Sequence, residues 1–73
     1  MTTKADSTIK TLEDQGWTIS HTALCPTYRC AGSVSPMQTR KGVEYCRVHH
    51  GKSIPGKGYS YQLTTVMSRR LDS

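Results

Sequence analysis

Cysteine and histidine residues are concentrated in one stretch of this 73-residue chain, and their spacing constrains the fold more than any other feature. All three cysteines and two of the three histidines lie between Cys25 and His50. Cys25 and Cys30 are separated by four residues, and Cys46 and His49 by two. Two such pairs, joined by a loop of fifteen residues, suit a tetrahedral Zn²⁺ ion because each pair can sit on one turn. The pattern predicts a structural Cys3His zinc site.

The predicted zinc ligands are Cys25, Cys30, Cys46 and His49. His50 is a close alternative for the fourth ligand, and His21 is a further one. Three unliganded thiols, or redox chemistry at the cysteines, are the alternatives to a metal site.

A bound metal would stabilise a chain that has little apolar material for a core. Only 34% of the residues are hydrophobic, and the chain contains no Phe and one Trp. A chain of this size buries only about 60% of the surface that its unfolded form exposes. Three cysteines cannot all pair with one another, and the N-terminal residues include no apolar stretch typical of a secretion signal. We therefore expect reduced cysteines, a cytoplasmic location and no membrane span.

Local patterns predict a short helix and a strand before the first cysteine. Residues 6–16 have an N-cap candidate at Asp6 or Ser7 and end on a glycine suited to the C-terminal cap. Residues 17–20 alternate apolar and polar side chains, which is typical of a half-buried strand. Trp17 is predicted to form the centre of the core.

The rest of the chain is predicted to contain a β-hairpin and a less regular C-terminus. Residues 34–38 and 43–46 have the composition of paired strands, with the turn at 40–42. Residues 51–58 are rich in Gly, Pro and Lys, which predicts a flexible linker. Residues 59–73 combine apolar side chains at helical spacing with β-branched ones, which predicts a short helix or a disordered tail.

Together these elements predict a small α+β fold in a single domain, with an ordered core over 7–50 around a zinc-finger-like site. A metal turn at each end of a hairpin resembles a zinc ribbon or zinc-finger-like module over the 26 residues 25–50. The pattern departs from a typical ribbon, which pairs Cys-x2-Cys with Cys-x2-Cys. The resemblance implies a structural zinc ion whose protein ligands leave no open position for a substrate.

Positive charge is concentrated in the C-terminal two thirds of the chain. Residues 1–24 carry two basic and three acidic side chains, a net charge of −1, whereas residues 25–73 carry eight basic and two acidic ones, a net charge of +6. Four tyrosines are interleaved with these basic residues, as on surfaces that hold phosphates and stack on bases. The residues predicted to contact a partner or nucleic acid are Arg29, Arg40, Lys41, Arg47, Lys52, Lys57, Tyr59, Tyr61, Arg69 and Arg70.

The sequence shows no catalytic machinery, because its five acidic residues are scattered and no Glu adjoins a candidate ligand histidine. A small basic chain with one zinc-like site is similar to the RNA-polymerase-binding transcription regulators that bacteriophages make, including those of Xanthomonas phages. The resemblance implies a non-enzymatic regulator that binds bacterial RNA polymerase in the host cytoplasm and inhibits initiation or promotes antitermination. The alternative is a zinc-stabilised nucleic-acid-binding protein that contacts phosphates through its basic two thirds. We expect a monomer in either case.

Overall fold

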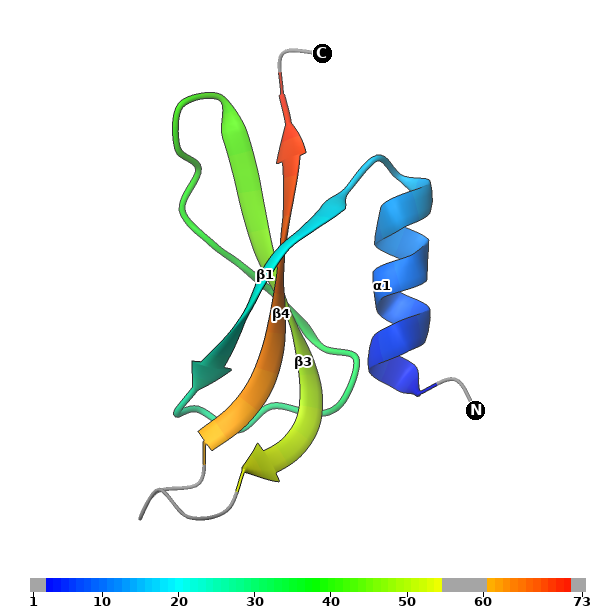
Figure 1. Ribbon diagram of the computed structural model, residues 1–73, viewed down its shortest axis with the longest axis vertical. Coiled ribbons are helices and arrows are strands. Elements are labelled where there is room, and N and C mark those ends of the chain that lie inside the picture. Colours follow the sequence, from blue (N-terminus) through cyan, green and yellow to red (C-terminus); the bar gives the residue numbers. More distant parts are fainter. Residues whose placement is uncertain (1–2, 55–60, 72–73) are drawn as a thin grey trace.

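One helix and four strands make up the described part of the chain, which covers residues 3–54 and 61–71 of a computed structural model. The elements are α1 (Lys4–Asp14), β1 (Thr18–Cys25), β2 (Val34–Pro36), β3 (Val43–Ile54) and β4 (Tyr61–Arg70). The strands form one antiparallel sheet in the order β1–β4–β3–β2, and α1 packs on one face of it (Figure 1). The predicted α+β fold around a zinc-finger-like site is therefore wrong, because the chain is mostly β and its C-terminal segment is a strand.

Helix α1 begins earlier than predicted because Thr3 caps it. The Thr3 hydroxyl accepts a hydrogen bond from Asp6 N at 3.0 Å, and the Asp6 carboxylate accepts one from Thr3 N at 3.4 Å. This reciprocal capping box satisfies two backbone donors near the start of the helix. The predicted end is confirmed, since the helix stops just before Gly16, whose φ of 96° lies in the left-handed region that glycine adopts readily. Among the described residues, no helix has the length and apolar character that a membrane span requires.

The apolar core lies between α1 and the two central strands of the sheet. Its buried members are Ala5, Cys46, Val48 and Met67. Ile9, Leu12 and Trp17 are partly buried and pack against them. The prediction that Trp17 forms the centre of the core is therefore wrong, because Trp17 borders the core. The guanidinium of Arg69 lies over the Trp17 ring, with its Cζ 4.8 Å from the ring centroid.

Strand β4 is the largest departure from prediction, because residues 59–73 were expected to form a short helix or a disordered tail. It lies between β1 and β3 and pairs with both. Four consecutive side chains, from Thr64 to Met67, are buried, so both faces of the strand are covered. The β-branched side chains in this segment favour the extended conformation once neighbouring strands are present.

The predicted hairpin between β2 and β3 is present, although β2 ends at Pro36 and not at residue 38. Its turn has the geometry of a two-residue connection. The backbones of Arg40 and Val43 exchange hydrogen bonds of 2.9 and 2.8 Å. Between them, Lys41 and Gly42 have φ values of 50° and 76°. Positive φ at both turn positions matches the twist of the flanking antiparallel strands.

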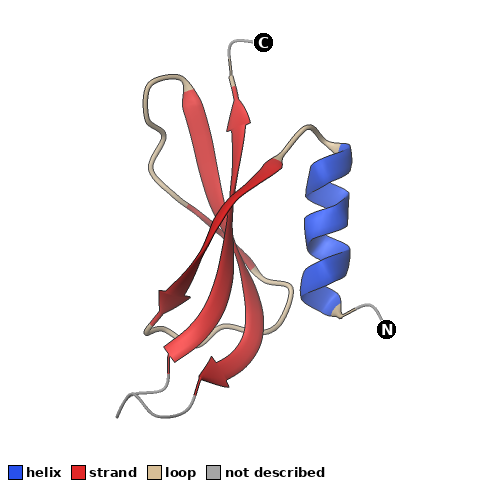
Figure 2. Cartoon of the chain, in the orientation of Figure 1, coloured by secondary structure: helices blue, strands red, loops and turns tan. Residues whose placement is uncertain are grey.

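Strands β1 and β3 are both longer than the sequence predicts, and the sheet is strongly twisted (Figure 2). The strand predicted over 17–20 continues to Cys25, with an irregularity between Ile19 and His21. Strand β3 includes the first part of the predicted linker 51–58. The remainder of that linker lies outside the described residues.

The two faces of the sheet bury different kinds of side chain. On the face toward α1, Cys46 pairs with Met67 in the apolar core. On the opposite face, the buried side chains of His49, Gln62 and Thr64 are polar. Residues from both edge strands, β1 and β2, line a cavity over this second face. The sheet therefore carries an open cavity on the side away from the helix, beside these buried polar side chains.

Candidate functional site

The structure separates the four predicted zinc ligands. Cys46 is buried beneath α1, whereas His49 lies on the opposite face of the sheet. Both residues belong to β3, and successive side chains of a strand point to opposite faces of the sheet. Two residues three positions apart therefore lie on opposite faces, whereas on the predicted turn they would face the same metal ion. Cys25 ends β1 on the His49 side, and Cys30 is exposed in the loop that follows. Within the described ranges, no three His, Cys, Asp or Glu side chains lie close enough to hold a metal ion. Zinc binding stays a prediction.

Cys46 is a core residue in the structure. Its side chain is 5% exposed and contacts the apolar cluster under α1. Burial raises the pKa of the Cys46 thiol, the Glu44 carboxylate raises it further, and Arg69 lowers it. A raised pKa keeps the thiol protonated at neutral pH, and the protonated form is a poor metal ligand and a poor nucleophile.

Substitution of Cys46 distinguishes a core residue from a metal ligand. We expect Cys46→Val to change the free energy of unfolding by less than about 1.5 kcal/mol, because it replaces one small apolar group with another. Cys46→Ser should cost about 1–3 kcal/mol, because it places a hydroxyl in an apolar cluster. Urea unfolding monitored by Trp17 fluorescence measures both. Equal and severe loss of stability in the two variants would show that Cys46 acts as a ligand.

His49 connects three strands through its two ring nitrogens. Nε2 lies 2.9 Å from Ser35 Oγ on β2, and Nδ1 lies 3.0 Å from Gln62 Oε1 on β4. Because the amide oxygen of Gln62 only accepts hydrogen bonds, Nδ1 carries the proton. Gln62 in turn holds the backbone of Arg29, donating to Arg29 O at 2.6 Å and accepting from Arg29 N at 3.1 Å. This network fixes the loop between β1 and β2 against the sheet.

The other two histidines have separate partners. His50 Nε2 lies 2.7 Å from Thr65 Oγ1. His21 is exposed, and its Nδ1 lies 3.0 Å from Ser20 Oγ. Neither of the alternative zinc ligands therefore stands in a metal-binding group among the described residues.

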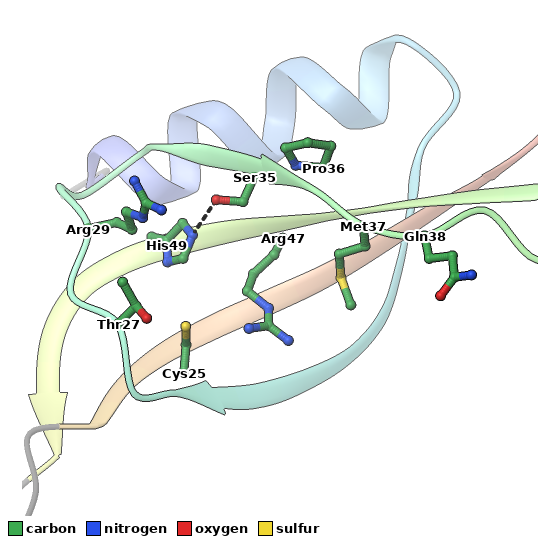
Figure 3. A pocket seen from close by; sticks show the side chains of 9 residues that line it. All are labelled: Cys25, Thr27, Arg29, Ser35, Pro36, Met37, Gln38, Arg47 and His49. Atoms are coloured by element: carbon green, nitrogen blue, oxygen red, sulfur yellow. Dashed lines mark hydrogen bonds between the residues drawn. The ribbon is translucent and has the colours of Figure 1, made fainter.

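A cavity of about 320 Å³ lies beside the His49 network. Figure 3 shows its lining, which comes from β1, the loop after it, β2, the segment that follows β2, and β3. Arg29 and Arg47 both line this cavity, and the Arg47 side chain extends into it from β3. The two guanidinium groups give the lining of the cavity positive charge.

A second cavity, of about 390 Å³, adjoins the first on the same face of the sheet. The two cavities share Met37 and Gln38 in their lining. The second adds the basic side chain of Arg40 and the aromatic ring of Tyr45, together with His21. We refer to the two cavities together as the basic cleft.

Among the described residues, no acidic side chain lines the basic cleft. Within residues 3–54 and 61–71, the acids are Asp6, Glu13, Asp14 and Glu44. The first three belong to α1, and Glu44 forms an ion pair with Arg69. The described acidic side chains thus lie on the helix side of the sheet, and an anionic ligand in the basic cleft meets no competing carboxylate among them.

Some of the predicted contact residues meet in the basic cleft and others do not. Arg29, Arg40 and Arg47 line it. Arg69 is held on the helix side by Glu44 and Trp17. The lining does not include Lys41, Lys52, Tyr61 or Arg70. Lys57 and Tyr59 lie outside the described residues.

The sequence gives no signal for two residues that support the cleft. Ser35 and Gln62 hold His49 from both sides, yet Gln62 lies in the segment that was predicted to be a helix or a tail. Its role depends on the pairing of β4 with β3, which brings together residues 13 positions apart in the chain.

Comparison of the chain with protein-family models, curated proteins and solved structures finds no match. RNA-polymerase binding stays a prediction from the sequence. The function is therefore inferred from the chemistry of the basic cleft.

Proposed function

We propose that the chain binds single-stranded nucleic acid in the basic cleft. The observation that carries this proposal is the separation of charge. Arg29, Arg40 and Arg47 line the cleft, whereas the described acidic side chains belong to α1 or to the Glu44 ion pair. A polyanion gains favourable contacts with three guanidinium groups and meets no carboxylate there.

The shape of the cleft favours a single strand over a duplex. The arginines line cavities between the two edges of a twisted sheet, and a flexible strand can enter such a space. A duplex presents its phosphates on a stiff, convex surface. Tyr45, which lines the second cavity, supplies an aromatic ring on which a base can stack. Stacking tolerates any base, so we expect weak sequence preference.

Salt dependence tests the proposal. A fluorescently labelled single strand of about 15 nucleotides is titrated with the protein between about 50 and 200 mM NaCl, and anisotropy reports binding. Three arginine–phosphate contacts give an expected slope of log K against log salt of about −2, since each contributes about 0.7. A duplex of the same sequence should bind more weakly. A slope near zero, or no binding at the lowest salt concentration, would contradict the proposal.

RNA-polymerase binding, implied by the resemblance to phage regulators, calls for a different experiment. The tagged protein is recovered from bacterial lysate with and without nuclease treatment, and its partners are identified by mass spectrometry. Polymerase subunits that remain after nuclease treatment would support a regulator that docks on the enzyme. Loss of all partners with the nucleic acid would support nucleic-acid binding in place of a direct contact with the enzyme.

A further inference from the structure

We propose that Arg47 forms a phosphate-binding subsite in the first cavity of the basic cleft. This inference rests on the proposed function and deepens it, because it names the chemical group that is held and the side chain that holds it. The ligand is a phosphate group, and it can belong to a nucleic-acid strand or to free inorganic phosphate.

The position of Arg47 leaves one of its donors without a protein acceptor. Arg47 is flanked on the sheet by Ser35 of β2 and Val66 of β4. Its Nε atom is buried and has no hydrogen-bond partner within residues 3–54 and 61–71. The side chain extends into the first cavity (Figure 3). A buried N–H without an acceptor is unfavourable, so the Arg47 guanidinium gains stability when it donates to an anion in the cavity.

Arg69 is an arginine of the same sheet whose partners lie within the protein. Its Nε donates to Glu44 Oε1 at 2.6 Å, and its guanidinium lies over the Trp17 ring. Arg69 is thus satisfied by an acid and an aromatic ring on the helix side. Within the described part of the chain, Arg47 on the cleft side has neither partner, and no acidic side chain lines the cavity it faces. The contrast points to an external anion as the partner of Arg47.

The guanidinium group suits phosphate because of its geometry. Nε and a terminal nitrogen present two parallel N–H groups, which match two oxygens of one phosphate. Arg29 lines the same cavity and supplies a second positive charge. His49 and Ser35 are already hydrogen-bonded to each other, so they support the wall of the subsite. A lysine in place of Arg47 would keep the charge but lose the paired donors.

The first test observes the arginine Nε–H signals by NMR in the full-length protein. Inorganic phosphate and the short single strand are added in separate titrations. We expect the Arg47 Nε–H signal to shift and saturate with each ligand, while the Arg69 Nε–H signal stays in place. An Arg47 signal that responds to neither ligand would overturn the inference.

The second test compares variants in the anisotropy assay. Arg47→Lys should weaken binding of the single strand at least tenfold, although the net charge is unchanged. Lys10→Gln, on the exposed surface of α1, should leave binding within about twofold even though it removes a charge. Wild-type affinity in the Arg47→Lys variant would overturn the inference.

The outcomes separate this inference from the proposed function. If the single strand binds normally to Arg47→Lys, the cleft binds nucleic acid and the subsite is wrong. If the wild-type protein binds no single strand but its Arg47 Nε–H signal still titrates with inorganic phosphate, the subsite stands as a phosphate site and the proposed function fails. Should Arg47→Lys lose its folded amide spectrum, the wild-type NMR titration decides the question alone.

Discussion

Removal of residues 59–73 is expected to unfold the protein. The deletion takes away β4, which pairs with β1 on one side and β3 on the other. It also removes Val66 and Met67, both fully buried. The elements that remain are α1, an unpaired β1 and the β2–β3 hairpin, and an isolated hairpin is marginal in water. The expected loss is therefore the entire stability of the domain, which for natural proteins is about 5–15 kcal/mol.

Circular dichroism and amide NMR of the chain ending at residue 58 measure this effect. We expect loss of the strand signal and a narrow range of amide shifts. The control is Leu71→Ser in the full-length chain, because Leu71 is exposed and follows β4. That variant should change stability by no more than about 0.5 kcal/mol. A truncated chain with a dispersed, native-like spectrum would instead support the tail that the sequence predicts.

The elements that could be predicted from the sequence are those with local signals. The end of α1 is marked by Gly16, and the turn of the hairpin by Lys41 and Gly42, where the backbone needs positive φ. The start of α1 was predicted a few residues too late. Asp6 and Ser7 are also suitable N-cap residues, so the sequence alone did not single out Thr3, whose capping box with Asp6 begins the helix.

Strand β4 could not be predicted from periodicity. A strand with one buried face shows alternation, but Thr64, Thr65, Val66 and Met67 are all buried. Because consecutive residues are buried, the sequence lacks the alternation of apolar and polar side chains that is typical of a strand. Leu63, Val66 and Met67 also fit the spacing of a helix. Burial on both faces is a property of the assembled sheet.

The candidate site was predicted only in part, for a related reason. Arg29, Arg40 and Arg47 were singled out by their charge, but so was Arg69, which the fold places on the other face. The metal prediction treated Cys46 and His49 as neighbours on a turn. In a strand the same spacing sends them to opposite sides of the sheet.

The central claim is that the three cleft arginines bind nucleic acid because of where they lie. A variant with Arg29→Gln, Arg40→Gln and Arg47→Gln removes three charges from the basic cleft. A matched variant with Lys4→Gln, Lys10→Gln and Lys41→Gln removes the same charge from exposed positions outside it. Thermal unfolding checks that both variants fold.

The deciding measurement is the affinity of both triple variants for the labelled single strand at one salt concentration. Each arginine–phosphate contact contributes about 1.5–3 kcal/mol when the hydrogen bond is charged. We therefore predict that the cleft variant binds at least about a hundredfold more weakly than the wild type, whereas the matched variant stays within about fivefold. Equal losses in the two variants would mean that net charge alone governs binding, and an unchanged cleft variant would contradict the site itself.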